Sequence, residues 1–317
     1  MPLPTRPADS SSEVLYDWRL DEIVVSLRQL RDASLAARKR LGCPAKLPSR
    51  RTLTSIVDQV CAALFPNRLS ARELKDESVD FYVGHTLDQA LRELVEQVVQ
   101  EYRFVHSDGN GLEEARQKAI ELVRNFAADL PSIRAVLDTD IRAAYESDPA
   151  ARSVDEVLAC YPGVRAVMHH RIAHALHRRG ACLIARMISE IAHSLTGVEI
   201  HPGATIGESF FIDHGTGVVI GETSIIGDRV HLYHGVTLGA RSRSLQERHD
   251  ADHVTSRHPI VEDDVTIYSG ATLLGPIRVG RGSVIGGNVW LTTSVQAGSN
   301  ISQAALRSEA FDEGLGI

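Results

Sequence analysis

The sequence has few aromatic residues, few cysteines and no excess of positive charge. Aromatic residues make up 5% of its 317 residues, and the formal net charge is −7. This charge does not indicate a general nucleic-acid binder, because such proteins carry a basic surface. The cysteines show no CxxC spacing, which predicts free, mostly buried thiols in a reducing compartment. They are Cys43, Cys61, Cys160 and Cys182.

Long apolar segments are also absent. The sequence contains no uninterrupted apolar run of about 18 residues, so we expect no transmembrane helix. The polar segment Met1–Ser12 lacks the apolar centre of a signal peptide. The sequence therefore predicts a soluble cytoplasmic protein.

The first part of the chain has apolar residues at helical spacing. Between 86 and 102, for example, Leu87, Leu91, Leu94 and Val98 fall on one helical face. We expect helices over residues 20–41, 54–64, 86–102, from about 112, and over 131–146, 153–160 and 163–195. The last of these contains His169, His170, His174 and His177 with Arg171, Arg178 and Arg179, which we interpret as a solvated or interface face rather than a metal site.

From Gly197 onward the period changes to six. The aliphatic residues that keep this spacing are Ile200, Ile206 and Ile212, then Ile220, Ile226, Leu232 and Leu238, and finally Val261, Ile267, Leu273, Val279, Ile285 and Leu291. A hexapeptide repeat is typical of a parallel β-helix, in which one aliphatic residue per unit points into a three-sided prism. A β-sandwich would instead alternate with a period of two.

The sequence therefore predicts an α+β protein, with an α-helical N-terminal domain followed by a left-handed parallel β-helix. We expect the helical domain over 1–195, with 1–15 disordered, the β-helix over 196–298 and a flexible tail over 299–317. A polar loop at 239–259 interrupts the repeat, and a loop of this length inside a solenoid is usually functional or disordered.

Glu199 and His214 are candidate catalytic residues. They are fifteen residues apart, and a turn of this coil takes about eighteen, so we expect them to lie close together on adjacent turns. A carboxylate beside an imidazole orients the ring for general-base catalysis on a hydroxyl. Structural hydrogen bonds would be compatible with the same spacing, so the spacing alone leaves both interpretations open.

Four segments together resemble the serine acetyltransferase family in wording, order and spacing. They are GVEIHPGATIG at 197–207, FIDHGTGVVIGET at 211–223, GVTLG at 235–239 and RHP at 257–259. The resemblance extends over about residues 140–295. It implies a reaction in which serine and acetyl-CoA form O-acetylserine.

The resemblance also implies roles for individual residues. His214 matches the family's catalytic base and Glu199 its acidic partner. The serine-binding positions are matched by Asp148, Asp213, Arg257 and His258, of which Arg257 would hold the carboxylate of serine, a task suited to a guanidinium. Small residues at Gly239, Ala240, Gly270 and Ala271 would let the pantetheine arm of acetyl-CoA approach the backbone. No metal is implied.

The family's assembly gives three further expectations. We expect a homotrimer or a dimer of trimers, with active sites between neighbouring subunits. The acidic tail that ends at Ile317 is similar to tails that bind O-acetylserine sulfhydrylase. Inhibition by cysteine at the serine site is also implied. The chain departs from the family after GVTLG, where Ala240 and Arg241 follow, and its loop to Arg257 is longer than usual.

Three other functions remain open on the sequence. The first is an acyltransferase of the same fold with a sugar or amine acceptor, against which the mixed charges of Asp148, Asp213 and Arg257 argue. The second is a β-helix metalloenzyme that uses His231, His234, His249, His253 or His258, although their spacing matches no three-histidine zinc site. The third is a non-catalytic scaffold, against which the presence of both Glu199 and His214 argues.

Overall fold

The computed structural model describes residues 18–37, 46–71, 73–105, 111–241 and 256–303. Residues 1–46 and 47–317 form two separate compact units. The first contains one described helix, α1 (Leu20–Ala37), and the second contains all other described elements. None of the described helices combines the length and apolar character needed to cross a membrane.

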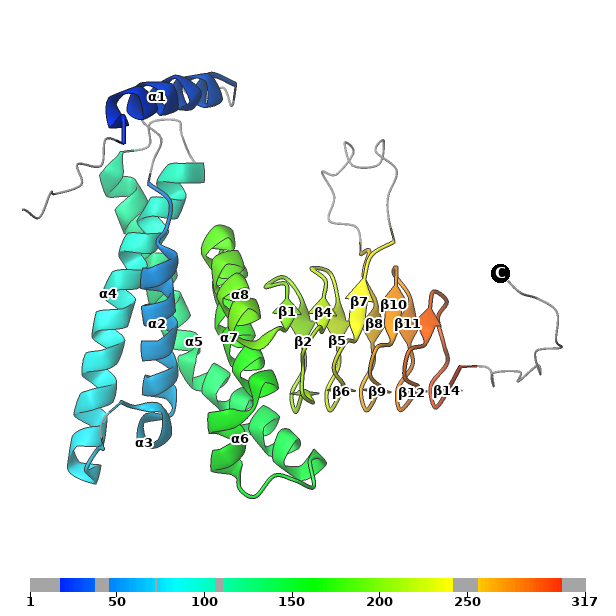
Figure 1. Ribbon diagram of the computed structural model, residues 1–317. Helices are drawn as coiled ribbons and strands as arrows, with labels where there is room; N and C mark the ends of the chain where they lie inside the picture. The colour runs from blue at the N-terminus through cyan, green and yellow to red at the C-terminus, as the bar shows by residue number, and fades with distance from the viewer. Residues whose placement is uncertain (1–17, 38–45, 72, 106–110, 242–255, 304–317) are drawn as a thin grey trace, which may run out of the picture. The chain divides into compact units, whose positions relative to one another are not determined.

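The helical part of the second unit begins with α2 (Arg50–Leu64) and the short α3 (Pro66–Leu69). After a 3₁₀ turn (Asp76–Ser78) come α4 (Val79–Val105), α5 (Leu112–Ser147), α6 (Val154–Cys160), α7 (Pro162–His177) and α8 (Cys182–Thr196) (Figure 1). Two sequence predictions are corrected. Pro131 lies inside α5 rather than at the start of a helix. Proline removes one hydrogen bond of the helix, but this position is exposed, so water can bond the carbonyl that is left free. The helix predicted over 163–195 is two helices, separated near Gly180, whose φ of +93° does not continue a helix.

A buried carboxylate joins two of these helices. Glu101 of α4 accepts hydrogen bonds from the amides of Leu183 (2.8 Å) and Ile184 (3.0 Å), in the first turn of α8. These amides have no partner inside their own helix, so Glu101 acts as a cap supplied by a distant element. Burial raises the pKa of Glu101, although the bonds from α8 oppose the shift.

The coil after α8 has three flat faces, each a parallel sheet. Face A contains β1 (Glu199–Ile200), β4 (Val219–Ile220), β7 (Thr237–Gly239), β10 (Thr272–Leu274) and β13 (Trp290–Leu291). Face B contains β2 (Thr205–Ile206), β5 (Ile225–Ile226), β8 (Ile260–Val261) and β11 (Arg278–Val279). Face C contains β3 (Phe211–Ile212), β6 (His231–Leu232), β9 (Thr266–Ile267), β12 (Val284–Ile285) and β14 (Asn300–Ile301). The strands of each face stack along the coil (Figure 1).

The six-residue period predicted this core correctly. Every one of the thirteen aliphatic residues of the repeat is buried, and none is more than 8% exposed. The register follows the period, since Val219 pairs with Thr237 and Thr272 pairs with Trp290, each eighteen residues on. Burying one such side chain stabilises the fold by about 1.5–3 kcal/mol. The expected α+β fold with a left-handed parallel β-helix is confirmed.

The helices are fixed to the first turn of the coil at close contacts. Arg171 of α7 forms a bidentate ion pair with Asp140 of α5, and its guanidinium also donates to the carbonyls of Ile206 (2.7 Å) and Gly207 (2.6 Å). Gly163 lies directly on face C, where an added Cβ would be 2.0 Å from the carbonyl oxygen of Ile212. The end of α5 is therefore held in a defined position beside the coil.

Two expectations about buried groups are corrected. Of the described cysteines, only Cys61 is buried, while Cys160 and Cys182 are exposed. In the histidine cluster, His169 and His170 are each 2% exposed and belong to the core of α7 rather than to a solvated face. Burial lowers the pKa of both imidazoles. Cys43 lies outside the described residues.

Candidate functional site

The turn that carries the candidate base is two residues longer than the regular turn of eighteen. Glu199 pairs with Val219, twenty residues on, whereas Val219 pairs with Thr237, eighteen on. The two extra residues lie in the corner between face C and face A, at 213–217, which explains the offset in the aliphatic repeat after Ile212. In this corner His214 has a φ of +59°, a left-handed conformation that is uncommon for a residue with a side chain.

The first cluster lies along the C–A edge, where the chain turns from face C to face A. Nδ1 of His214 is 3.7 Å from Oδ1 of Asp213, within ion-pair distance but too long for a hydrogen bond. Asp148, directly after α5, accepts hydrogen bonds from the hydroxyl of Tyr161 and the amide of Ala150 (2.8 Å). The Tyr161 bond is the main reason why the pKa of Asp148 is lowered, and His214 contributes to the same shift.

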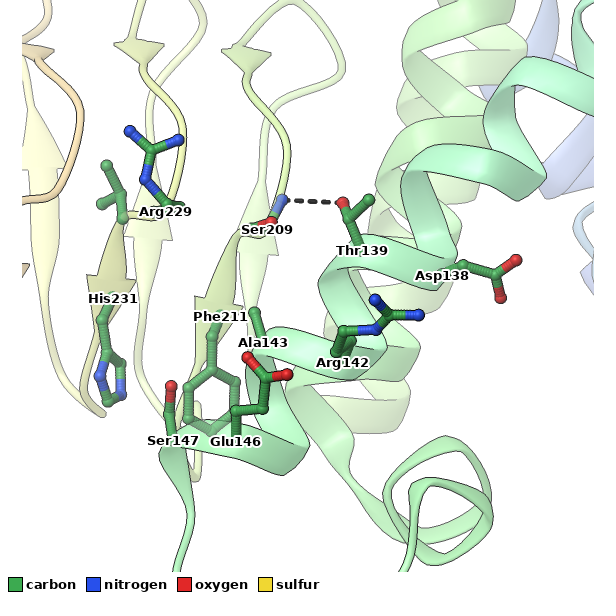
Figure 2. A pocket seen from close by; sticks show the side chains of 11 residues that line it. Asp138, Thr139, Arg142, Ala143, Glu146, Ser147, Ser209, Phe211, Arg229 and His231 are labelled. Atoms are coloured by element: carbon green, nitrogen blue, oxygen red, sulfur yellow. Dashed lines mark hydrogen bonds between the residues drawn. The ribbon is translucent and has the colours of Figure 1, made fainter.

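A cavity of about 380 Å³ adjoins this cluster between α5 and the coil. Figure 2 shows Ser147, next to Asp148, on one side of it and His231 on the other, with Thr139 bonded to the amide of Ser209 (2.9 Å). Burial lowers the pKa of His231, and the charge of Asp213 opposes this shift. Asp213 is therefore close enough to His231, which lines the cavity, for its charge to act on that ring.

The second cluster lies along the A–B edge, where the chain turns from face A to face B. Arg257 forms an ion pair with Glu222. His258 is 7% exposed, and its Nδ1 lies 3.1 Å from the amide nitrogen and 2.8 Å from the hydroxyl of Thr223. Desolvation, followed by the charge of Arg257, lowers the pKa of His258. His201 belongs to the same edge, and burial lowers its pKa to about 4.

Glu199 does not contact His214 in the structure. Its Oε1 is 3.3 Å from Nη2 of Arg186, which also pairs with Glu190 at 2.9 Å. The described residues contain no ion pair between Glu199 and His214. The two extra residues of the corner explain why fifteen residues in sequence did not bring them together.

The small residues predicted to bind acetyl-CoA are divided between the two edges. Gly239 and Ala240 are on the A–B side, and Gly270 and Ala271 are in a C–A corner. Gly270 has a φ of +71°, and an added Cβ would be 2.3 Å from Oδ1 of Asn288, so the fold itself requires glycine there. The side chain of Ala271 is fully buried, and its carbonyl accepts from Thr237.

The structure adds residues that the sequence did not single out. Tyr161 contacts Asp148 across α6, and no sequence pattern indicated that contact. Glu222 and Thr223 stand in the family-like string at 211–223, but their partners, Arg257 and His258, lie 35 residues away. Within the described ranges no three or more His, Cys, Asp or Glu residues are arranged to hold a metal ion. His249, His253 and Ile317 lie outside the described residues.

A helical bundle followed by a three-sided parallel coil of hexapeptide repeats, with a histidine–aspartate corner on one edge, is typical of a hexapeptide-repeat acyltransferase. No known protein-family model matches the chain. It is 49% identical to a plasmid-encoded serine acetyltransferase of Synechococcus elongatus, over 98% of this chain and 99% of the relative. The chain belongs to the serine acetyltransferase family.

Solved structures agree with this assignment. Serine acetyltransferase isoform 3 of Entamoeba histolytica, in complex with cysteine, matches with a TM-score of 0.69 at 32% identity. The match covers 82% of this chain and 84% of the isoform 3 chain. A soybean serine acetyltransferase complexed with serine has a TM-score of 0.51 at 28% identity, over 77% of this chain and 93% of its own.

Proposed function

We propose that the protein transfers an acetyl group from acetyl-CoA to the hydroxyl of L-serine and so catalyses the first step of cysteine biosynthesis. The observation that carries this proposal is the near full-length match to a serine acetyltransferase. The corner with Asp148, Asp213 and His214 supports it. Two carboxylates beside one imidazole suit an acceptor that carries both an ammonium group and a hydroxyl.

In the proposed reaction His214 is the general base. Its imidazole takes the hydroxyl proton of serine while the serine oxygen attacks the thioester carbon. The C–S bond then breaks and the imidazolium gives the proton to the sulfur, so that coenzyme A leaves as the thiol. Asp148 and Asp213 bind the ammonium group, and Arg257 binds the carboxylate in bidentate fashion. No acyl-enzyme is needed, because both substrates are held in one ternary complex.

We propose that Glu199 supports His214 after its side chain turns away from Arg186. The contact to Arg186 is long, at 3.3 Å, and both side chains are partly exposed. Breaking an exposed pair of this kind costs at most about 1 kcal/mol. Arg186 keeps Glu190 as a partner, so the movement leaves no cation unpaired.

We propose that a complete site forms between two copies of the chain. Asp148, Asp213 and His214 lie on the C–A edge, and Arg257 and His258 lie on the A–B edge, across face A. The side chain of His214 is 73% exposed in a single chain, which is unusually open for a general base in an active site that must exclude water. In a homotrimer, or a dimer of trimers, the C–A edge of one copy faces the A–B edge of the next. Acetyl-CoA would then lie between the copies, near Gly239 and Ala240 of one and Gly270 and Ala271 of the other.

Two further parts of the proposal rest on sequence. We propose that the acidic tail ending at Ile317 binds O-acetylserine sulfhydrylase, the enzyme that would use the product. We also propose a cytoplasmic location, where the free thiols of Cys61, Cys160 and Cys182 stay reduced.

The proposed function is tested by measuring thiol release from acetyl-CoA in the presence of serine. We expect His214→Ala to lower kcat by at least about 100-fold, the scale of losing a general base. His85→Ala, an exposed histidine of α4, is the matched control and should behave as wild type. Turnover with a sugar or a simple amine in place of serine, or full activity of His214→Ala, would reject the assignment.

A further inference from the structure

The hydrogen bonds around His258 determine which ring nitrogen carries its proton. The amide of Thr223 points at Nδ1 from 3.1 Å, and an amide can only donate. Nδ1 must therefore be an acceptor without a proton. In the neutral ring the proton is then on Nε2.

The hydroxyl of Thr223 reinforces this arrangement. Its oxygen accepts from the amides of Arg257 (2.9 Å) and His258 (3.2 Å), which uses both lone pairs. Its one hydrogen is then free to donate to Nδ1 of His258, 2.8 Å away. A proton on Nδ1 would meet two donors at once, so charging the ring would break this set of bonds.

Gly221 supplies the space in which the ring lies. An added Cβ at this position would be 2.0 Å from Cδ2 and 2.1 Å from Nε2 of His258. The ring is therefore packed closely against the backbone of the preceding turn, and any larger residue at position 221 would displace it. Among the described residues, no hydrogen-bond partner occupies Nε2, so the single chain leaves this donor unused.

We propose that Thr223 is a positioning residue that holds His258 as a neutral imidazole with its proton on Nε2, so that the ring donates a hydrogen bond to an oxygen of the acceptor amino acid. This inference rests on the proposed function, because it assigns a task to the serine site. It also gives physical reasons for two residues of the segment Gly221–Thr223. Glu222 between them forms an ion pair with Arg257, the guanidinium of the same edge.

The first experiment compares Thr223→Val with Thr223→Ser. Valine keeps the shape but removes the hydroxyl, so we expect kcat/KM for serine to fall by about tenfold or more, mainly through KM. The variant Thr223→Ser keeps a hydroxyl, so its kcat/KM should stay within about threefold of the wild-type value. KM for acetyl-CoA should be unchanged. Thr205→Val, at an exposed position of β2, is the matched control. Wild-type kinetics in Thr223→Val would overturn the proposal.

The second experiment compares two substitutions of His258 itself and remains informative if Thr223→Val does not fold. A glutamine amide can place an N–H where Nε2 was, whereas asparagine reaches only the position of Nδ1. We expect His258→Gln to retain at least about ten times the kcat/KM of His258→Asn. Equal activity of the two variants would contradict a donor role at Nε2.

A spectroscopic measurement separates this inference from the proposed function. In ¹⁵N-histidine-labelled protein, the resonances that disappear in His258→Gln belong to His258, and their shifts report which nitrogen is protonated. We expect the Nε2–H form near neutral pH. An Nδ1–H form or a charged ring would overturn the inference, even if the enzyme acetylates serine. If the Nε2–H form is found in a protein that does not turn serine over, the proposed function fails instead.

Discussion

His214 adopts a backbone conformation that glycine accepts more readily. A non-glycine residue held in the left-handed region costs about 1–3 kcal/mol, which the surrounding structure must offset. Here the longer corner also contains Gly215 and Gly217, with φ of +87° and +78°, and the imidazole of His214 is largely exposed. The residue that we propose to do the chemistry therefore carries such strain, as do Ser209, Arg229, Asp264 and Asn288 in other corners of the coil.

Tyr161 gives a residue-scale prediction. Its hydroxyl donates to the carboxylate of Asp148, and this contact raises the pKa of Tyr161 to about 12, so the phenol remains a donor at every working pH. Tyr161→Phe removes a hydrogen bond to a charged group, worth about 1.5–3 kcal/mol. We expect KM for serine to rise by about tenfold with little change in kcat, measured by steady-state thiol release.

The control for this prediction is a second tyrosine-to-phenylalanine change. Tyr82→Phe, in α4, removes a hydroxyl elsewhere and should leave both constants unchanged. If Tyr161→Phe lowers kcat and leaves KM unaltered, Tyr161 acts on the chemical step and not on the placement of Asp148.

At the scale of elements, we predict opposite effects on stability for alanine at two helical glycines, one packed against the coil and one in open space. Gly163→Ala would force a Cβ against the carbonyl of Ile212, and overpacking of this kind destabilises by about 1–3 kcal/mol. Gly84, inside α4, has no atom within 4 Å of an added Cβ, so Gly84→Ala should stabilise by about 0.5–1 kcal/mol. Chemical denaturation of both variants measures the difference, and two changes of equal sign would contradict the packing described here.

The elements also show where sequence reasoning succeeds. A period of six is a local property, and each inward residue such as Ile226 or Leu273 is buried for the same reason, so the β-helix could be predicted residue by residue. The repeat slips by two residues between Ile212 and Ile220, and the structure has its longer corner at that point. The break between α7 and α8 was missed because the apolar spacing continues through Gly180 and hides the turn.

The contacts of the candidate site could be predicted much less well. Glu222 meets Arg257, and Thr223 meets His258, across a long insertion whose length gives no register. The single chain does not form the contact expected between Glu199 and His214, because Arg186 from α8 pairs with Glu199. No spacing within the coil could indicate a cation from the helical part, and the role of Glu199 stays a prediction. Local repeats determine which residues face outward, but neighbours from other elements determine what those residues touch.

At the scale of the whole molecule, the two edges of face A each carry half of the charges that serine requires. The carboxylates that we propose to bind the ammonium group and the proposed base are on the C–A edge, and Arg257, which we propose to bind the carboxylate, is on the A–B edge. A closed ring of identical copies brings unlike edges together at every interface, because such contacts are head-to-tail. A single chain would then bind serine poorly however well it folds.

This arrangement predicts complementation between two inactive variants. His214→Ala and Arg257→Ala each damage a different edge, so each homo-oligomer has only defective sites. When the two are co-expressed, an intact C–A edge from an Arg257→Ala chain can face an intact A–B edge from a His214→Ala chain. Each edge is intact in half of the chains, so about a quarter of the sites should regain both and about a quarter of wild-type activity should return.

Co-expression of His214→Ala with Asp213→Ala, which damages the same edge, is the control and should restore nothing. If the first pair also remains inactive although the chains assemble together, both edges of one chain must serve the same site, and the proposed placement of serine between copies is wrong.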